Sequence, residues 1–325
     1  MNNPTMSERV EEYLAYRRAL GYQLRIEGQM LWSFARYADQ LGHSGPLTTE
    51  VALRWARLPE RASQLYQARR LEVVRTLAKY LAPREPATEI PPRRLLGPAH
   101  ARRTPFIYSQ ADITALVETA KALGSADSLR PRTYASLIGL LACTGLRISE
   151  ALTLGHDDVN LDVGVLTIRQ TKFGKSRLVP LHPSAIGPLR DYATARDRRQ
   201  GAMHQTTFFV SDSGRPLAYS TVRQTFHQVL RAVLPNSASS GRSRPRLHDL
   251  RHTFACQRLL ESYHDGSNID RAVDQLSTYL GHAKVTDTYW YLTGIPELLA
   301  LAARRFEEFT IPTHGGFQCT LPSTP

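Results

Sequence analysis

The stretch T-G-L-R-I-S-E-A-L, residues 144–152, lies between two segments with helical patterning. Gly145 breaks the helix predicted over 132–144, so Arg147 stands at the start of the next helix, where free backbone N–H groups favour an anion. Glu150 follows at a spacing that lets its carboxylate hold the guanidinium of Arg147. Taken alone, the stretch fits either an anion-binding helix start or an ordinary helix start with an ion pair.

The chain around this stretch, from residue 106 onward, is mostly helical in pattern. Two short apolar runs, V-G-V-L-T-I-R (163–169) and R-L-V-P-L (177–181), flank T-K-F-G-K-S and predict a β-hairpin. A third short strand is expected at 207–210. The predicted helices span 109–123, 132–144, 183–199, 219–234, 248–263, 269–281 and 297–309. The fold class expected is mainly α with a small β-hairpin or sheet.

Residues 1–82 predict a separate helical domain. Ser7 is the expected N-cap of the first helix, Gly21 breaks that helix, and further helices are expected near 24–41, 48–57 and 62–82. Arg69 and Arg70 give the last of these a basic face. Residues 83–105 contain six prolines and are expected to form an extended linker. A catalytic domain over 106–310 and a tail over 311–325 complete the predicted organisation.

The charge balance indicates a polyanionic partner. The 325 residues include 41 Lys and Arg against 29 Asp and Glu, a net charge of +12. An arginine-rich genome would produce the same excess without any such partner. No apolar run is long enough for a membrane span, the N-terminus lacks a signal-peptide pattern, and three scattered cysteines form no disulfide framework. We therefore expect a cytoplasmic protein associated with the nucleoid.

The predicted hairpin turn carries Lys172 and Lys175, two of only five lysines in the chain. A lysine differs from an arginine in that it can give up a proton. The turn is therefore either a mobile cationic tip with a chemical role or an ordinary solvated turn.

The stretch L-H-D-L-R-H-T-F-A, residues 247–255, places His248 and Arg251 on one helix face. His252 follows His248 at H-x-x-x-H spacing, with Asp249 next to the first histidine. That layout is close to the H-E-x-x-H pattern of zinc proteases, so a zinc hydrolase is a competing interpretation. In such an enzyme His282 would be the third ligand and Asp249 the base.

The stretch L-G-H-A-K-V-T-D-T-Y-W-Y-L, residues 280–292, ends a helix at Gly281 and sets His282 on the turn. Tyr289 and Tyr291 follow. They are two residues apart, about 200° around a helix, so the two phenols cannot face the same group. Packing of an aromatic cluster onto the core is the alternative interpretation.

These motifs, in this order, resemble the tyrosine recombinase (phage integrase) family. The pattern is Arg in T-G-L-R-x-S-E, Lys on a hairpin, H-x-x-R, L-G-H, and a tyrosine nine residues beyond that histidine. The resemblance covers about 105–310, and all six positions are filled. It implies a helical core-binding domain followed by a mixed α/β catalytic domain, which together clamp DNA.

The resemblance also implies roles for individual residues. Tyr291 would attack phosphorus and form a 3′-phosphotyrosine, while Arg147 and Arg251 would hold the non-bridging oxygens. Lys172 would be the general acid and His248 would assist proton transfer. The implied supporting roles are a hydrogen bond from His282 to the phosphate and the orientation of Arg147 by Glu150. Tyr289 is the rival for Tyr291, and Lys175 is the rival for Lys172.

The expected partner is a double-stranded recombination site, and no cofactor or metal is expected. Further DNA contacts are predicted, all by basic side chains: Arg69, Arg70, Lys175 and Arg177. The resemblance implies a tetramer, homomeric or heteromeric, on two DNA duplexes. Its C-terminal helix, 297–309, would dock on a neighbouring protomer; packing on its own domain is the alternative. A Xer-like resolvase and a mobile-element recombinase both remain open, with a weak preference for the latter.

Three alternative functions are considered beside recombination. A zinc hydrolase would leave Arg147, Lys172 and Tyr291 unexplained and would place Arg251 beside its metal. A catalytically silent DNA-binding regulator would not need the complete set of six residues. A relaxing type IB topoisomerase would share the site, but the chain length and the L-G-H…Tyr ending favour a recombinase.

Overall fold

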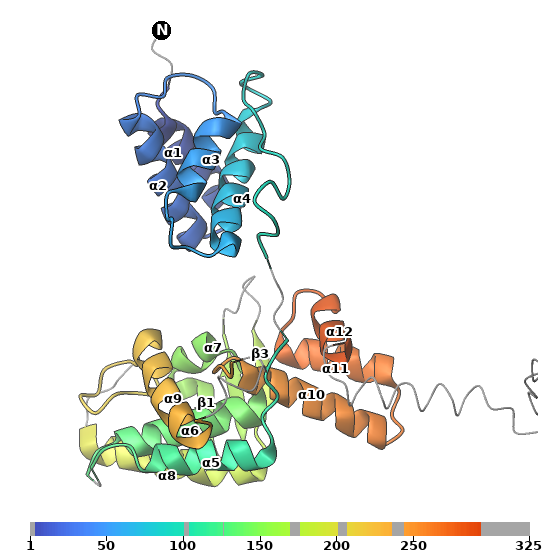
Figure 1. The fold of residues 1–325 in the computed structure, drawn as a ribbon. Helices are drawn as coiled ribbons and strands as arrows, with labels where there is room; N and C mark the ends of the chain where they lie inside the picture. Colours follow the sequence, from blue (N-terminus) through green and yellow to red (C-terminus); the bar gives the residue numbers. More distant parts are fainter. Residues whose placement is uncertain are drawn as a thin grey trace, which may run out of the picture. The chain divides into compact units, whose positions relative to one another are not determined.

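The computed structural model describes residues 4–100, 104–125, 127–169, 176–200, 207–235 and 244–293, and it divides into two compact units, Met1–Arg103 and Thr104–Pro325. Helices dominate both units, and a small antiparallel sheet belongs to the second (Figure 1). The predicted fold class is therefore confirmed. Among the described residues, no helix combines the length and the apolar character that crossing a membrane requires.

The N-terminal unit is a bundle of four helices around one apolar core. The helices are α1 (Met6–Ala19), α2 (Arg25–Gln40), α3 (Thr49–Arg57) and α4 (Gln64–Leu81). Phe34, Trp55 and Leu77 are fully buried at its centre. The first helix begins earlier than expected: Thr5, not Ser7, is the N-cap, in a capping box with Glu8. Ser7 instead binds Asp39 of α2 through its backbone N–H and its hydroxyl.

The proline-rich segment after α4 differs from the extended linker that we expected. Residues 83–100 form no regular helix or strand, as their prolines require, but they pack along the N-terminal unit. The Glu89 N–H donates to Leu47 O (2.9 Å), Arg75 Nε donates to Pro91 O (2.8 Å), and Leu96 is buried in the core. Prolines exclude regular structure without excluding packing, and the division between the units lies at Arg103/Thr104.

One of the two arginines proposed on the basic face of α4 is part of the core. Arg70 is 8% exposed; its guanidinium lies 3.7 Å from the centroid of the Trp55 ring and donates to Trp55 O at 2.8 Å. Cation–π contact and burial explain this position, so the predicted DNA contact of Arg70 is corrected to a structural role. Arg69 is partly exposed beside Glu27 (3.5 Å) and remains a predicted DNA contact.

The C-terminal unit contains eight α-helices and three strands within the described residues. They are α5 (Gln110–Lys121), α6 (Arg130–Thr144), α7 (Ile148–Leu152), β1 (Val159–Asn160), β2 (Val165–Ile168), β3 (Arg177–Pro180), α8 (Pro183–Gln200), α9 (Tyr219–Val233), α10 (Asp249–His264), α11 (Ile269–Leu280) and α12 (Thr286–Thr293). A 3-10 turn, His156–Asp158, precedes β1.

The sheet has the order β1-β2-β3, all antiparallel, with Leu166 opposite Val179. The two predicted hairpin strands are confirmed as β2 and β3. The strand expected at 207–210 is wrong: in the described chain this segment makes one isolated bridge, Val210 to Pro216, while its apolar side chains fill the core. The apolar character of residues 207–210 therefore predicted their burial correctly, but the strand pairing inferred from it was wrong.

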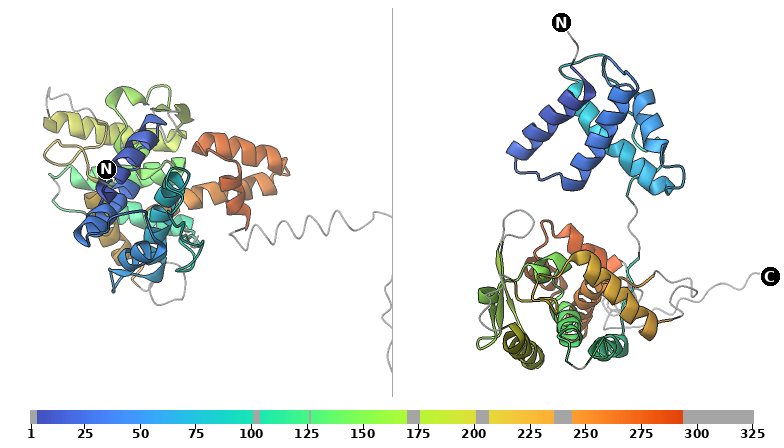
Figure 2. Two further views of the ribbon diagram at one scale, coloured as in Figure 1. Left: turned by 90° about the horizontal axis from the view of Figure 1, so that it is seen from above. Right: turned by 90° about the vertical axis from the view of Figure 1, so that its left-hand side faces the viewer.

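Two apolar clusters hold this unit together. The larger one centres on α6, which packs on α5, α8 and α10 and buries Leu137, Ile138 and Leu141. Side chains of α9 and the sheet belong to the same cluster. The smaller one joins α10, α11 and α12, which lie together at one side of the unit (Figures 1 and 2). It includes Phe254, Leu280 and Tyr291. Helix ends that are distant in sequence therefore meet where α6, α10 and α11 come together.

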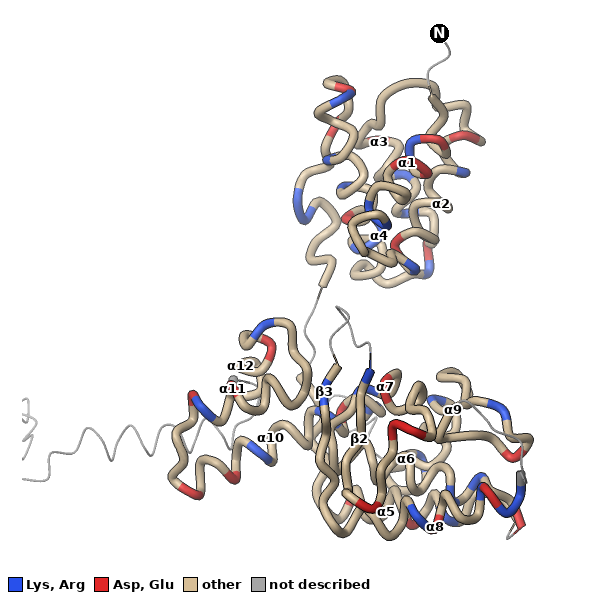
Figure 3. Tube along the Cα trace, turned by 180° about the vertical axis from the view of Figure 1, so that it is seen from behind, with Lys and Arg blue, Asp and Glu red and all other residues tan. Residues whose placement is uncertain are grey.

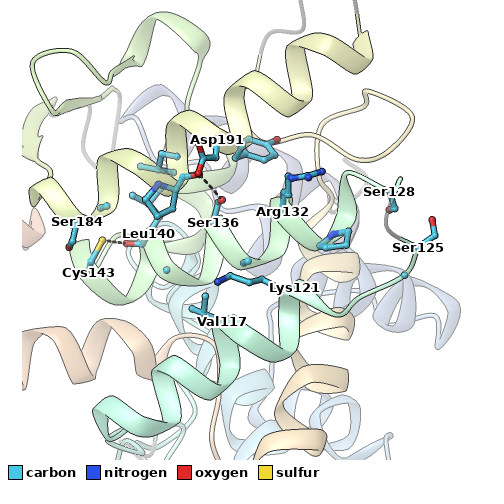
Figure 4. A pocket seen from close by; sticks show the side chains of 18 residues that line it. Val117, Lys121, Ser125, Ser128, Arg132, Ser136, Leu140, Cys143, Ser184 and Asp191 are labelled. Carbon is cyan, nitrogen blue, oxygen red and sulfur yellow. Dashed lines mark hydrogen bonds between the residues drawn. The ribbon is translucent and has the colours of Figure 1, made fainter.

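Two glycines near the end of α6 have opposite surroundings. Gly145 ends the helix at φ 61°, and a Cβ there would meet Phe254 Cδ1 at 2.5 Å. Gly139 lies within the helix beside a cavity of about 620 Å³ between α5, α6 and α8, and a Cβ there would meet nothing within 4 Å (Figure 4). Gly145 therefore has a conformational and steric need for glycine that Gly139 lacks.

We expect Gly145→Ala to lower the free energy of unfolding by roughly 2–4 kcal/mol, because a left-handed φ and overpacking both oppose the methyl group. Gly139→Ala is the matched control and should raise the free energy of unfolding by roughly 0.5–1 kcal/mol, since alanine loses less entropy in a helix interior. Urea unfolding of the full chain, followed by circular dichroism, measures both. Equal effects of the two substitutions would contradict this assignment.

Candidate active site

Five of the six residues singled out in the sequence lie together in the C-terminal unit: Arg147, His248, Arg251, His282 and Tyr291. Arg251 in α10 donates to Gly145 O and Leu280 O, both at 2.8 Å. Arg147 donates to Gly281 O at 3.1 Å, and the ring centroids of His282 and Tyr291 are 6.0 Å apart. The sixth residue, Lys172, and its rival Lys175 lie outside the described residues.

The site is built from helix ends. Gly145 and Gly281, both with a left-handed φ (61° and 65°), end α6 and α11 as predicted. Arg147 is the N-cap of α7, and His248 is the N-cap of α10. Helix ends leave backbone groups unpaired, and here the carbonyl oxygens at two C-termini accept hydrogen bonds from the arginines.

Glu150 holds Arg147 as expected. The Glu150 carboxylate is nearly buried; it accepts from Arg147 Nη1 (2.8 Å) and from the Arg147 backbone N–H (2.9 Å). Burial alone would raise the pKa of this carboxyl, but hydrogen bonds and positive charge from Arg177 and Arg147 lower its pKa to about 2. Glu150 is therefore ionised throughout the neutral range.

Arg177 has a different place from the one predicted. Its side chain is 12% exposed, and it donates Nη2 to Glu150 Oε2 (2.8 Å), Nη1 to Glu150 Oε1 (3.2 Å) and Nε to Tyr279 O (2.7 Å). A guanidinium with these three bonds is committed to protein partners. The predicted DNA contact of Arg177 is therefore corrected to a structural role. The prediction failed because the sequence gives no sign that Glu150, 27 positions earlier, would bind this arginine.

Arg251 is a buried positive charge. The residue is 3% exposed, and among the described residues no carboxylate forms an ion pair with it. Burial and the nearby Arg147 lower its pKa to about 10, so it stays protonated at neutral pH. A buried cation without an anionic partner is costly, and such groups mark sites that bind an anion.

Three histidines lie near this charge, and burial together with neighbouring positive charge, that of Arg251 in each case, keeps them neutral. Burial, followed by charged or polar neighbours including Arg251, lowers the pKa of His248 and His282 to about 4 and that of His252 to about 3. His282 Nδ1 lies 2.7 Å from the hydroxyl of Thr288, which is fully buried. This contact fixes the ring and leaves Nε2 for another partner.

Tyr291 and Tyr289 lie in different surroundings, as their spacing on a helix requires. Tyr291 is 4% exposed, and the centroid of its ring lies 6.0 Å from that of His282 and 5.4 Å from that of His252. Burial raises the pKa of Tyr291, and the charge of Arg251 acts in the opposite direction. Tyr289 is 41% exposed and its hydroxyl lies 3.4 Å from Asp270 Oδ1. Only Tyr291 therefore belongs to the cluster.

The residues of the zinc interpretation do not form a metal site. Within the described part of the chain, no group of three or more His, Cys, Asp or Glu side chains is arranged to hold a metal ion. Asp249, the base in that interpretation, is fully buried and accepts from Arg246 Nη2 at 2.9 Å. His252 instead packs edge-on against His248 and Trp290.

Sequence reasoning missed two residues of this site. Thr288, which holds His282, belongs to α12, a helix whose bounds the sequence pattern did not reveal. For Arg177 sequence reasoning missed the partnership with Glu150, since this residue was predicted only as a DNA contact. Its signal was its place directly after the turn of the predicted hairpin, but no local spacing connects it with Glu150.

Comparison with known proteins identifies the family. Residues 108–294 match the model of the phage integrase family. An integrase/recombinase of Sinorhizobium fredii is 42% identical over 307 residues, covering 93% of this chain and 97% of that protein. The tyrosine recombinase XerD of Bradyrhizobium diazoefficiens is 29% identical over 291 residues, covering 84% and 86%. The chain belongs to the phage integrase family, the tyrosine recombinases.

Solved structures share the fold. The Tn1549 transposon integrase in complex with transposon right end DNA has a TM-score of 0.68 at 15% identity, covering 94% of this chain and 99% of that one. The XerH site-specific recombinase bound to palindromic difH substrate has a TM-score of 0.63 at 19% identity, covering 93% and 85%.

The low pKa of Glu150 predicts a pH dependence of stability. Because the pKa of Glu150 in the folded protein (about 2) lies below the ordinary value of a glutamate (4.5), the contribution of this carboxylate to stability is present above about pH 4.5 and is lost as the pH falls toward 2. At 1.36 kcal/mol per unit the contribution is about 3 kcal/mol. The stability difference between wild type and Glu150→Gln should therefore shrink between pH 7 and roughly pH 3, as measured by urea unfolding.

The control is Glu118→Gln, which removes a carboxylate from an exposed pair with Lys121. Exposed pairs contribute little, so its difference from wild type should be small at both pH values. A Glu150→Gln difference that does not change with pH would refute the prediction.

Proposed function

We propose that this protein cuts and rejoins DNA at specific sites, with Tyr291 as the nucleophile. The observation that carries the proposal is the position of Tyr291, buried against His282 and next to Arg251, a cation without a carboxylate partner in the described chain. A phenol beside such a cation suits attack on a phosphodiester. The similarity to integrases and recombinases supports the same chemistry.

The proposed reaction conserves the energy of the phosphodiester. Tyr291 Oη attacks phosphorus, the bond to the 5′-oxygen breaks, and a 3′-phosphotyrosine and a free 5′-hydroxyl result. The 5′-hydroxyl of another strand then attacks the phosphotyrosine and releases the phenol. Every bond broken is replaced by one of similar energy, so the proposal needs neither a cofactor nor a metal.

Arg147 and Arg251 are the proposed phosphate clamp. A guanidinium has five N–H donors, and Arg251 uses two terminal nitrogens on Gly145 O and Leu280 O. Each terminal nitrogen carries a second hydrogen, so donors remain for the non-bridging oxygens. Charge builds on these oxygens in the transition state, and removing one such donor costs roughly 100- to 1,000-fold in rate.

One hydrogen bond and two proton transfers are assigned to three other residues. His282 would donate from Nε2 to the phosphate, since Nδ1 is engaged by Thr288. His248 would assist proton transfer at Tyr291, and Lys172 would protonate the departing 5′-oxygen. An incoming phosphate brings negative charge, which raises the pKa of the histidines from the low values of the free site.

DNA is the proposed partner of both units. Basic residues occur along both of them, and the net charge is +12 (Figure 3). Arg69 is retained as a proposed phosphate contact of the N-terminal unit. All six residues of the family pattern are present in the sequence, which argues against a catalytically silent regulator.

We further propose a tetramer on two duplexes, in which segment 297–309 docks on a neighbouring protomer. This segment lies outside the described residues. Such a protein would act in the cytoplasm, at the nucleoid. The biological role proposed is that of a mobile-element recombinase, with a Xer-like resolvase as the second candidate. A XerD tyrosine recombinase is similar in sequence, and a transposon integrase is similar in fold.

The direct test of the nucleophile needs no knowledge of the target sequence. The protein is expressed in cells, covalent protein–DNA adducts are captured under denaturing conditions, and the attached DNA ends are sequenced. We expect adducts at clustered end sequences, with the modification on the peptide that contains Tyr291. Tyr291→Phe should abolish the adducts and leave DNA binding within about three-fold, because a phenyl ring keeps the packing but not the nucleophile.

Tyr289→Phe is the matched control, since it removes an exposed hydroxyl two residues away. It should retain adduct formation. Adducts that persist in Tyr291→Phe would disprove the assignment of the nucleophile, and wild-type DNA binding without any adduct would favour the regulator.

Chelation separates this chemistry from a zinc hydrolase. Because no bond in the proposed reaction involves a metal ion, EDTA should leave the rate of adduct formation in purified protein unchanged. His248→Ala should slow that rate, whereas a zinc enzyme would lose activity with either treatment. Loss of cleavage on chelation, restored by added zinc, would overturn the proposed mechanism.

A further inference from the structure

The end of the β2–β3 pair nearest the connecting turn is joined to the active site through one side chain. Arg177 is the first residue of β3, opposite Ile168 at the end of β2. Its guanidinium reaches Glu150 in α7 and Tyr279 O near the end of α11. Three elements that are distant in sequence are therefore fixed by one planar group.

We infer that Arg177 is a positioning residue for the proposed strand cleavage: it neutralises Glu150, so that Arg147 keeps a free positive charge for the phosphate, and it fixes the turn that carries His282. The inference rests on the proposed function. Arg177 itself need not touch DNA.

The charge argument starts from the shared carboxylate. Glu150 Oε1 accepts from both Arg147 Nη1 (2.8 Å) and Arg177 Nη1 (3.2 Å), and Oε2 accepts from Arg177 Nη2 (2.8 Å) and the Arg147 N–H (2.9 Å). One negative charge is thus divided between two guanidinium groups. Without Arg177, Glu150 would compensate Arg147 alone, and the attraction between Arg147 and a phosphate would fall.

The geometric argument concerns the turn after α11. Arg177 Nε holds Tyr279 O at 2.7 Å, and the guanidinium packs so closely on Gly281 that a Cβ there would meet Nη1 at 2.9 Å. Arg147 Nη2 donates to the carbonyl of the same glycine at 3.1 Å. His282 is the next residue in the chain, so Arg147 and Arg177 together fix the backbone from which its side chain extends.

These contacts require an arginine. Arg177 uses three nitrogens, in one plane, on two partners that lie in different directions. A lysine has the charge but a single nitrogen, so it can bind Glu150 or Tyr279 O and not both in this geometry. The charge and the fork can therefore be tested separately.

The experiment compares wild type with three variants on one substrate. The substrate is a nicked duplex built from the DNA ends recovered with the wild-type adducts, and the variants are Arg177→Gln, Arg177→Lys and the double variant Glu150→Gln/Arg177→Gln. Single-turnover adduct formation gives the cleavage rate, and a separate titration with the same duplex gives the Kd. Arg190→Gln is the control, because it removes one positive charge from an exposed pair with Asp162.

We expect Arg177→Gln to slow cleavage by roughly 10- to 100-fold, the range seen when groups that orient a reactive residue are removed, with Kd within about three-fold. Arg177→Lys should fall between Arg177→Gln and wild type, because it restores charge without the fork. The double variant should cleave at least about five-fold faster than Arg177→Gln, since the neutral amide that replaces the Glu150 carboxylate no longer compensates Arg147. Arg190→Gln should cleave at the wild-type rate.

The rescue is the decisive result, because a merely structural role predicts that the second substitution makes cleavage slower. A double variant no faster than Arg177→Gln would overturn the inference, as would an Arg177→Gln rate equal to wild type. If Arg177→Gln does not fold, as judged by circular dichroism, an Arg177→Lys rate equal to wild type would also overturn it. Absence of adducts in the wild type would instead refute the proposed function.

Discussion

The buried guanidinium of Arg251 is the constraint on which the C-terminal unit depends. A positive charge inside a protein must have its N–H groups satisfied, and the acceptors here are Gly145 O and Leu280 O, 106 and 29 residues away in sequence. Both carbonyls are available because α6 and α11 end at glycines with a left-handed φ. Helix termination and placement of the charge are therefore a single structural event. The same contacts bring the apolar cluster of α10–α12 against the larger core of α6.

The electrostatics of the site follow from this arrangement. Arg147 and Arg177 share one carboxylate, Glu150, and Arg251 is held by backbone carbonyls. The nearby acid Asp249 is bound by Arg246. The uncompensated positive charge adds to burial in lowering the pKa of His248 and His282 to about 4. Two properties of the free site therefore favour binding of an anion: the first is the excess of guanidinium groups over carboxylates, and the second is the set of neutral histidines. A bound phosphate satisfies the first and, by its charge, makes the second better proton carriers.

Local rules predicted the parts of the site that local chemistry determines. Gly145 and Gly281 end helices because they adopt a conformation that other residues avoid, Glu150 reaches Arg147 because they are three residues apart, and the angle between successive helix positions separates Tyr289 from Tyr291. Partnerships across the fold could not be read in this way. Nothing in the sequence distinguishes Arg70 and Arg177 from exposed arginines. In the fold, Arg70 is buried against Trp55 and Arg177 against Glu150. The six prolines correctly excluded helix and strand from residues 83–100 and 104–105, the described part of the predicted linker. They said nothing about whether residues such as Leu96 would be buried in a core.

The phosphate-binding groups and the nucleophile belong to different elements. Arg147 and Arg251 are fixed by backbone carbonyls at the ends of long helices, whereas Tyr291 lies on α12, an eight-residue helix that packs on α10 and α11. In the proposed reaction the same phosphorus is attacked twice, first by the phenol and then by a 5′-hydroxyl. The phosphate must keep its place while its nucleophile changes, which requires that the clamp does not depend on the tyrosine for its own geometry. The hydrogen bonds that hold Arg147 and Arg251 in place meet this condition, because they are made to backbone carbonyls and to Glu150, which belong to elements other than α12.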